Sequence, residues 1–363
     1  MIHIIGAGPA GGYSAYLLAK AGRDVSVYED GAEVGDPVQC TGIVTETIHS
    51  VQPFNINKLI INKITKVRIF SNGEDYVALR LKHPNPILDR KGLDQLIAEK
   101  AEGQGAKIFL KHRFMGFEGS KLVFKNDDNI LKIKKDILIG ADGPMSQVAR
   151  SSGLFGQRKF MSGIQATLKL KNDNCVDFFP FIGTFAWIVP ENEEIVRIGV
   201  GSYGSVKGHF DRFLKMRGID KKNIVGMQGG LIPMYNPQVQ TRADNTYLVG
   251  DAATQVKATT GGGIIQSLIA ANCLATALEN GGDYVKEWKA RLGKELWLHL
   301  KIRKVLDSFD GKDWCRLVQI FNTERNKRLL EECDRDSLTR FFARLVIGEP
   351  RLLYFIKYLA KAF

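Results

Sequence analysis

The chain has 363 residues, 44% of them hydrophobic, and a formal net charge of +12. Such a chain can bury a large core and is longer than one compact domain usually is, so we expect two domains and a tail. It contains no uncharged apolar run of about 18 residues and enters a strand at once, which predicts no transmembrane helix and no signal peptide. The five cysteines are odd in number and form no CxxC pair, which indicates a reducing cytosol, and the scattered histidines predict no metal site and no hydrolase.

The first residues show the pattern of a strand, a tight turn and a helix. We expect a strand over residues 2–5, and helical spacing of apolar residues continues as far as Gly22. The turn between them is Gly6-Ala7-Gly8-Pro9-Ala10-Gly11. In this motif the first glycine permits the turn, the second lets the backbone approach a pyrophosphate, and the third lets the helix pack closely on the strand. The phosphates then lie at the positive end of the helix.

A second strand is expected over residues 25–28, and Glu29 stands at its end. An acidic side chain there can accept hydrogen bonds from ribose hydroxyls, and no basic residue replaces it. This unit thus contains a strand, a glycine turn, a helix and a second strand that ends at an acidic residue. Such an arrangement predicts a dinucleotide site.

Two further glycine motifs each follow an apolar strand. They are Gly140-Ala141-Asp142-Gly143 and Gly250-Asp251-Ala252-Ala253. After the third motif, residues 259–264 lead into an apolar helix over 265–278. In a flavoprotein Asp251 would hold the ribitol, and the N–H groups after Gly262 would stabilise negative charge on the reduced flavin. The three motifs in this order therefore predict FAD.

Together these motifs resemble the FAD-dependent geranylgeranyl reductase family, within the flavoproteins related to p-hydroxybenzoate hydroxylase. The resemblance covers roughly residues 1–280, and residues 250–264 are most similar to the archaeal branch, which saturates the prenyl chains of ether lipids. Ala258 stands where this family usually has proline, so the loop over the flavin is expected to be less rigid. The implied reaction is hydride transfer from N5 of reduced FAD to one carbon of a prenyl double bond.

The resemblance extends to a cysteine loop over residues 37–42 and to Asp89-Arg90, which a helix follows. It implies that Cys40 lies close to the flavin ring and that Arg90 faces the cofactor. An isolated cysteine is also commonly a small packed apolar residue, which is the other interpretation of Cys40.

Residues 184–190 resemble the substrate-cavity motif of these reductases. Phe185 replaces a tyrosine and Val189 a phenylalanine, whereas Trp187 and Pro190 are kept. The segment also faintly resembles the tryptophan motif of flavin-dependent halogenases, and it can be an ordinary core strand.

The resemblance thus implies a set of site residues but no proton donor. The cofactor-binding residues are Gly6, Gly8, Ala10, Gly11, Glu29, Cys40, Thr41, Arg90, Phe114, Asp142, Asp251, Gly262, Gly263 and Ile264. Cys40 and Trp187 are expected beside the reaction, and Phe185, Trp187 and Pro190 beside the substrate.

The expected fold is α/β, with a Rossmann-type FAD-binding domain interleaved with an antiparallel-sheet substrate domain and followed by a C-terminal helical region. The FAD-binding domain is expected over residues 1–50, 85–155 and 240–280, the substrate domain over 51–84 and 156–239, and the helical region over 281–363.

The excess of basic residues raises the question of which anionic partner the protein binds. Residues 337–363 carry Arg340, Arg344, Arg351, Lys357 and Lys361 among aromatic and aliphatic residues, divided by Pro350 into two amphipathic helices. Such helices can lie in an anionic lipid interface, or they can pack as a cap on the FAD-binding domain. We expect a cytoplasmic protein at the inner face of the membrane and, because no recognition module occurs, no nucleic-acid partner.

Only one dinucleotide motif occurs, so the reductant of the FAD is expected to be NAD(P)H or a reduced ferredoxin that docks elsewhere. Three alternatives remain on the same scaffold: a flavin-dependent monooxygenase or halogenase, an electron-transfer flavoprotein dehydrogenase of the FixC type, and a non-catalytic flavin-binding protein. The Cys40 loop and the glycines at 261–263 favour the reductase.

Overall fold

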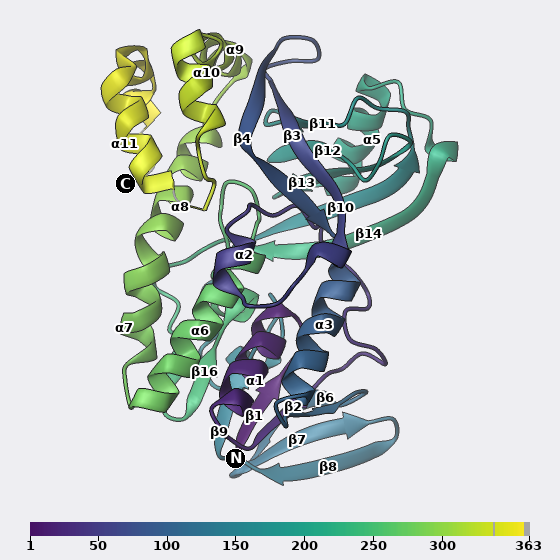
Figure 1. Ribbon diagram of the computed structural model, residues 1–363, viewed down its shortest axis with the longest axis vertical. Helices are drawn as coiled ribbons and strands as arrows, with labels where there is room; N and C mark the ends of the chain where they lie inside the picture. Colours follow the sequence, from purple (N-terminus) through teal and green to yellow (C-terminus); the bar gives the residue numbers. More distant parts are fainter. Residues whose placement is uncertain (337, 359–363) are drawn as a thin grey trace.

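The computed structural model describes residues 1–336 and 338–358 of the chain. These residues form two large sheets, one small sheet and a column of helices along one side (Figure 1). The expected α/β class, with a parallel nucleotide-binding sheet, an antiparallel sheet and a helical end, is confirmed.

The first sheet has six strands in the order β15-β16-β9-β1-β2-β5. Its strands are β1 (Ile2–Ile5), β2 (Val25–Tyr28), β5 (Lys107–Phe109), β9 (Ile137–Gly140), β15 (Arg242–Ala243) and β16 (Thr246–Leu248). The central strand β1 runs parallel to β2 and to β9, and both β1 and β2 are buried along their whole length. Continuous apolar strands of this kind are typical of parallel sheets that are covered on both faces.

Three helices pack side by side on one face of this sheet: α1 (Pro9–Lys20), α3 (Arg90–Glu102) and α6 (Ile264–Asn280). Their inner faces and the strands share one apolar core, in which Leu18, Ile97 and Leu268 are fully buried. The carboxyl end of β1 therefore meets the amino end of α1, as the first motif requires.

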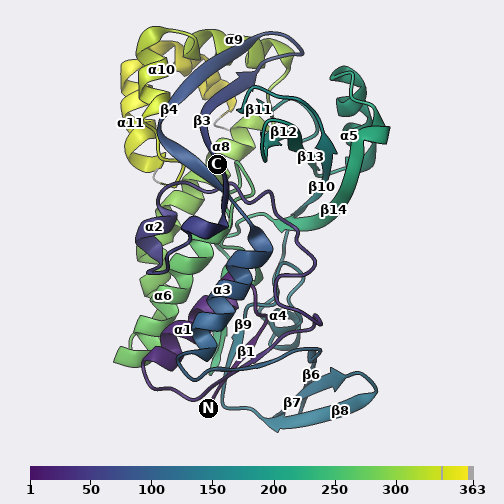
Figure 2. The same cartoon turned by 45° about the vertical axis from the view of Figure 1, so that its right-hand side comes forward.

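A small sheet lies beside the first and projects from its lower end (Figures 1 and 2). It consists of β6 (Arg113–Glu118), β7 (Lys121–Asn126) and β8 (Asn129–Lys134), and α4 (Gln147–Ser151) packs on β6.

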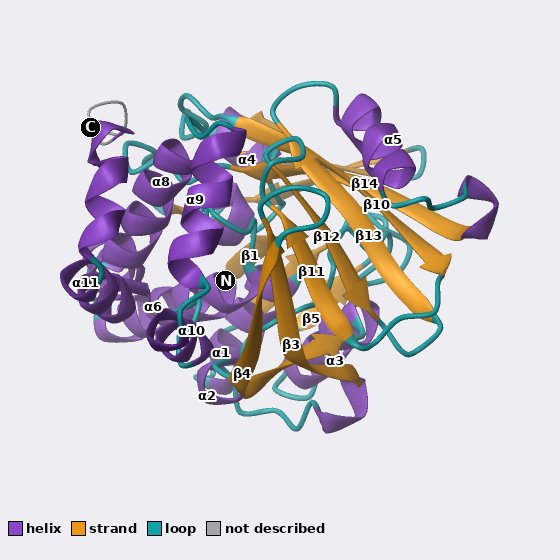
Figure 3. Ribbon diagram, turned by 90° about the horizontal axis from the view of Figure 1, so that it is seen from above, coloured by secondary structure: helices purple, strands orange, loops and turns teal. Residues whose placement is uncertain are grey.

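The second large sheet has seven strands in the order β14-β10-β13-β12-β11-β3-β4. Its strands are β3 (Ile60–Phe70), β4 (Tyr76–Leu88), β10 (Phe160–Lys169), β11 (Cys175–Phe179), β12 (Phe185–Pro190), β13 (Ile195–Ser202) and β14 (Ile224–Pro233). All neighbours pair antiparallel except β11 and β3. The helix α5 (Val206–Met216) covers one face through Phe210, Phe213 and Leu214 (Figure 3).

Segments from distant parts of the chain build each large sheet, which is the interleaving that we expected. The seven-stranded sheet takes its strands from residues 60–88 and 160–233, and the six-stranded sheet takes its strands from residues 2–28, 107–140 and 242–248. The division into domains at the expected residue boundaries stays a prediction.

The helical region begins with three helical segments that follow one another directly: α7 (Tyr284–Trp288), the π-helix η4 (Lys289–Gly293) and α8 (Lys294–Leu306). It continues with α9 (Gly311–Phe321), α10 (Glu324–Glu331), α11 (Leu338–Gly348) and the 3₁₀ helix η5 (Pro350–Tyr358). Short helices elsewhere are α2 (Ile48–Val51), η1 (Asn57–Leu59), η2 (Lys221–Asn223) and η3 (Gly250–Ala253). No helix in the described part of the chain is long and apolar enough to cross a membrane.

The two helices expected on either side of Pro350 are α11 and η5. Ser337, Leu359, Lys361 and Phe363, which belong to the same expected stretch, lie outside the described residues. Among the described residues, α11 packs on α8 and α10, and η5 packs on α9 and α11. The helices before them, α9 and α10, pack on β4 of the seven-stranded sheet, with Val318 against Val77 and Leu79. Both interpretations of α11 and η5, a lipid-facing pair and a cap on the FAD-binding domain, stay predictions.

Candidate flavin site

The three glycines of the first motif occupy positions with different steric demands. Gly6 has a φ of +95°, and a Cβ there would lie 2.5 Å from the carbonyl oxygen of Ala141. A Cβ on Gly11 would lie 1.9 Å from the carbonyl oxygen of Gly6, so only glycine permits this approach of helix and strand. A Cβ on Gly8 would meet nothing within 4 Å. The backbone of Gly8 is therefore open at the end of α1, where no side chain caps the helix.

Glu29 stabilises the same turn. Its Oε2 accepts a hydrogen bond from the N–H of Ala7 at 2.7 Å, and its Oε1 accepts one from the N–H of Gly31 at 2.9 Å. The carboxylate thus links the glycine turn to the chain that leaves β2. Its contact with a ribose stays a prediction.

The third motif lies against the first. Gly250 has a φ of +69°, and a Cβ there would come within 2.8 Å of the Cβ of Ala10. A Cβ on Gly263, the last residue before α6, would lie 3.0 Å from Oδ1 of Asp251. The structure therefore brings Ala10, Asp251, Gly263 and the amino end of α6 at Ile264 together. They lie at the edge of the six-stranded sheet where the strands β1 and β16 end.

Asp251 and Arg90 carry the charge of this edge. Burial raises the pKa of Asp251 to about 6, and the nearby Arg90 partly opposes this effect. Arg90 is buried and donates from Nη2 to both carboxylate oxygens of Asp94, at 3.0 and 3.1 Å. Its Nε and Nη1 are buried without a hydrogen-bond partner among the described residues, although the side chain lies close to Cys40.

Buried donors without partners are costly, and a polar ligand that accepts from them removes the cost. Two donors of Arg90 without partners among the described residues, the open backbone of Gly8 and the half-buried carboxylate of Asp251 are groups that a flavin dinucleotide can use. The residues present therefore fit FAD.

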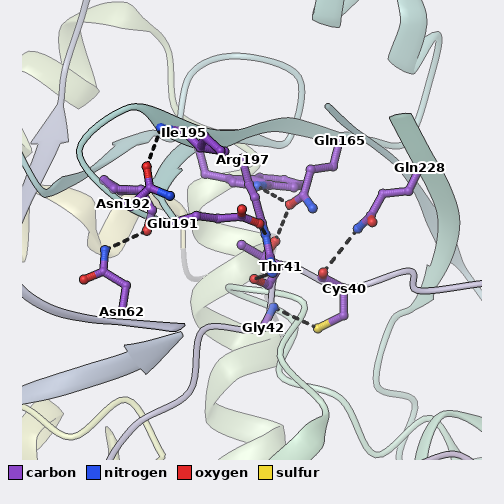
Figure 4. A network of polar contacts seen from close by, with 12 residues as sticks. Cys40, Thr41, Gly42, Asn62, Gln165, Glu191, Asn192, Ile195, Arg197 and Gln228 are labelled. Carbon is purple, nitrogen blue, oxygen red and sulfur yellow. Dashed lines mark hydrogen bonds and ion pairs between the residues drawn. The ribbon is translucent and has the colours of Figure 1, made fainter. Parts of the chain in front are cut away.

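The Cys40 loop is held against the seven-stranded sheet by side chains from three of its strands (Figure 4). Oγ1 of Thr41 donates to Oε1 of Gln165 at 2.7 Å, and Nε1 of Trp187 donates to the same oxygen at 3.0 Å. Arg197 donates to the carbonyl oxygen of Thr41, and Gln228 to that of Cys40 at 3.2 Å. The half-buried Cys40 thus lies between Arg90 and the sheet, and its thiol accepts from the N–H of Gly42 at 3.3 Å.

Gln165, Arg197 and Gln228 were not found by reasoning from the sequence. Gln165 is almost fully buried within β10, and a polar residue in the middle of a strand with apolar neighbours was the available signal.

Phe185 and Trp187 project from β12 into an apolar cluster between the seven-stranded sheet, the loop before α6 and α8. Its other members are Met161, Phe178, Tyr203, Ile232, Met234, Ala258 and Leu300. Pro190 does not join them, because side chains alternate along a strand and Pro190 shares the α5 side with Ala186 and Ile188. Val189, on the same side as Trp187, packs in a neighbouring apolar cluster that also includes part of Trp187.

Phe114 and Asp142 both have partners within the protein. The ring of Phe114 is buried in the core beside the small sheet, 5.7 Å from the ring centroid of Phe124. Asp142 accepts from Oγ of Ser146 at 2.6 Å and from the N–H of Val148 at 2.9 Å, and so orders the start of α4. Contacts of either residue with FAD stay predictions.

Known proteins resemble both the sequence and the fold. The model of the FAD binding domain family matches residues 1–201. Digeranylgeranylglycerophospholipid reductase of Methanothrix thermoacetophila is 27% identical over 393 residues, covering 98% of this chain and 98% of that protein. Digeranylgeranylglycerophospholipid reductase 3 of Methanosphaera stadtmanae is 30% identical over 349 residues, covering 85% and 87%. The solved structure of a geranylgeranyl bacteriochlorophyll reductase-like protein from Thermoplasma acidophilum has a TM-score of 0.82 at 20% identity, covering 99% and 98%.

The glycine turn, the buried Arg90 and the half-buried Asp251 define, with the matching domain model, an FAD-dependent oxidoreductase. Within that class the chain belongs to the digeranylgeranylglycerophospholipid reductase family.

The variants Gly8→Ala and Gly11→Ala should affect different properties, the first cofactor binding and the second folding. The methyl group added in Gly8→Ala meets no protein atom, so the apoprotein should keep its Tm while this group obstructs the pyrophosphate and weakens FAD binding by about tenfold or more. The methyl group added in Gly11→Ala must push α1 from the strand and should lower the stability by about 3 kcal/mol. Calorimetry of the apoproteins and fluorescence titration with FAD measure both. A large loss of Tm in Gly8→Ala would contradict this assignment.

Asp251→Asn should stabilise the apoprotein at high pH while weakening FAD binding. Because the folded-state pKa of Asp251 is raised to about 6, its carboxyl favours folding at low pH, and this contribution is lost as the pH rises from about 4 through 6. The variant should therefore gain about 1–2 kcal/mol at pH 8 and nothing at pH 4. Urea unfolding of both apoproteins at the two pH values measures this. A variant less stable than the wild type at pH 8 would mean that Asp251 has a stabilising partner.

Proposed function

We propose that this protein saturates the double bonds of geranylgeranyl chains on an archaeal ether phospholipid, with FAD as its redox cofactor. Two named reductases of this lipid class match most of the chain, which supports the proposal. The observation that carries the proposal is a pair of hydrogen bonds to Gln165, one from Thr41 and one from Trp187. They join the Cys40 loop to the apolar cluster.

The residues for the cofactor follow from the site. Gly8 and the amino end of α1 would take the pyrophosphate, and Glu29 the adenosine ribose. Arg90, Asp251 and the amino end of α6 at Gly262 and Gly263 would face the rest of the flavin. FAD bound there and reduced by the electron donor would supply a hydride from N5 to one carbon of the double bond, and the other carbon would take a proton.

The apolar cluster would accommodate the prenyl chain. An isolated double bond is a poor hydride acceptor, and its reaction is assisted when positive charge can develop on the tertiary carbon. The rings of Trp187 and Phe185 can stabilise that charge through cation–π attraction, and the cluster excludes water from it. The indole N–H of Trp187 is satisfied by Gln165, so the ring itself can face the chain.

The reductant would be NAD(P)H or a reduced ferredoxin. The described chain offers one glycine-rich dinucleotide turn, which FAD takes, so the electron donor would dock at another surface. Anaerobic mixing of the oxidised protein with each donor, followed by the bleaching of flavin absorbance, distinguishes them.

We also place the C-terminal helices at an anionic membrane surface, on the cytoplasmic side. Ile347, Leu353 and Ile356 leave 83%, 53% and 50% of their surface exposed, on α11 and η5. The same elements carry Arg344, Arg351 and Lys357, while Leu345 and Phe355 are buried. An apolar face with basic neighbours suits a lipid interface, from which the prenyl substrate would come.

Mass spectrometry of lipids tests the reaction. The purified protein, given unsaturated archaeal ether lipid with dithionite or reduced ferredoxin, should produce mass gains in steps of two hydrogens. Trp187→Ala should slow this at least about tenfold with FAD retained, because the wall beside the chain is lost. The matched control is Trp297→Ala on α8, which should keep full activity. A yellow wild-type protein that adds no hydrogen but consumes oxygen would indicate a monooxygenase or halogenase instead.

A triple serine variant at Ile347, Leu353 and Ile356 tests the membrane surface. It should keep its Tm, since these side chains are exposed, and lose about tenfold or more of its binding to anionic vesicles. Serine at Val225 and Met227, which are similarly exposed on β14, is the control and should leave binding unchanged. Co-sedimentation measures both, and equal binding of all three proteins would refute the surface.

A further inference from the structure

A buried carboxylate outside all the expected motifs lies behind the flavin site. Asp336 belongs to the turn between α10 and α11, and 3% of its side chain is exposed. Its Oδ1 accepts from Nζ of Lys257, with which it forms an ion pair, and from Nε2 of Gln266 at 2.8 Å. Its Oδ2 accepts from Oγ1 of Thr45 at 2.7 Å. One side chain of the helical region therefore binds three separate segments.

Each of these segments adjoins a part of the candidate site. Thr45 follows the Cys40 loop, Gln266 lies in the first turn of α6, and Lys257 begins the loop that ends at Gly263. Within this loop the N–H of Lys257 donates to the carbonyl oxygen of Gly262 at 3.0 Å. The Cε of Lys257 would lie 3.0 Å from a Cβ on Gly262, so the lysine side chain lies directly against the glycines.

The charges of Asp336 and Lys257 depend on each other. Burial alone would raise the pKa of Asp336, but the charge of Lys257 and the hydrogen bonds from Gln266 and Thr45 lower it to about 2. Burial also lowers the pKa of Lys257, and Asp336 opposes that effect. A buried charge left alone is destabilising, whereas a buried pair with further hydrogen bonds is tolerated. Asp336 is thus the group that allows a lysine to be buried beneath the loop.

We infer that Asp336 is a positioning residue, which holds the Lys257–Gly263 loop and the start of α6 in the arrangement that binds FAD. The inference rests on the proposed place of the flavin at Gly262 and Gly263. It assigns to the C-terminal helical region a part in cofactor binding, although the domain model of FAD binding ends at residue 201. Asp336 acts through Lys257 and Gln266 and need not contact the cofactor.

Asp336→Asn tests this, with Asp334→Asn as its matched control. Asp334 lies in the same turn and accepts from Oγ1 of Thr47 at 2.7 Å, but it is exposed and contacts neither Lys257 nor Gln266. Loss of the charged acceptor in Asp336→Asn should weaken FAD binding to the apoprotein about tenfold, as expected for a charge-assisted hydrogen bond. The Asp334→Asn protein should bind FAD within about twofold of the wild type.

A double variant separates positioning from stability. In Asp336→Asn the Lys257 ammonium is left buried without its partner, which should lower the Tm of the apoprotein. Adding Lys257→Met removes that charge and should restore the Tm, while FAD binding stays weak because the loop has lost its anchor.

Fluorescence titration with FAD and calorimetry of the four apoproteins give the result without any lipid. Recovery of both Tm and FAD affinity in the double variant would overturn the inference, as would unchanged affinity in Asp336→Asn. A wild-type protein that binds FAD but hydrogenates no lipid would refute the proposed function and leave this test intact.

Discussion

One amide oxygen connects the two halves of the site. Oε1 of Gln165 accepts from Thr41, in the Cys40 loop, and from Trp187, beside the apolar cluster. The connection depends on Gly199, which lies between Gln165 and Trp187 in the register of β10, β13 and β12. A Cβ on Gly199 would come within 2.2 Å of the indole ring, so the missing side chain is what lets Trp187 cross β13 and reach Gln165. The pairing register of the antiparallel sheet therefore decides where the Cys40 loop lies.

The parts of the site that the sequence predicts are local in the chain. Gly6, Gly8 and Gly11 act within one strand, turn and helix, so their spacing alone shows what each permits. Gln165 and Thr41 are 124 residues apart, and Gln266 and Asp336 are 70 apart. Such contacts depend on which strands and turns become neighbours, and periodicity does not contain that information.

The substrate motif illustrates a different limit. Read as a continuous sequence, Phe185, Trp187 and Pro190 look like one wall, but a strand divides its residues between two faces. Phe185 and Trp187 therefore reach the apolar cluster, whereas Pro190 lies on the α5 side. Side chains alternate between the two faces of a strand, so the sequence of residues 185–190 alone is enough to predict that Pro190 lies on the opposite face from Phe185 and Trp187. The interleaving of the two sheets was predictable for a related reason, since three nucleotide motifs separated by about a hundred residues leave room for another sheet between them.

The charges around the site fall into two kinds, and their difference follows from position. Arg90 keeps two buried donors free among the described residues, and Asp251 has its pKa raised to about 6, so the groups at the cofactor edge are incompletely satisfied in the protein itself. Asp336, one layer further out, has three donors and a pKa of about 2. Cofactor binding gains most from groups that lack partners, and it loses least entropy when the loop that carries them is already fixed. A satisfied outer layer that holds an unsatisfied inner layer meets both conditions, because the hydrogen bonds to Asp336 fix the loop while the Arg90 donors are left for a ligand.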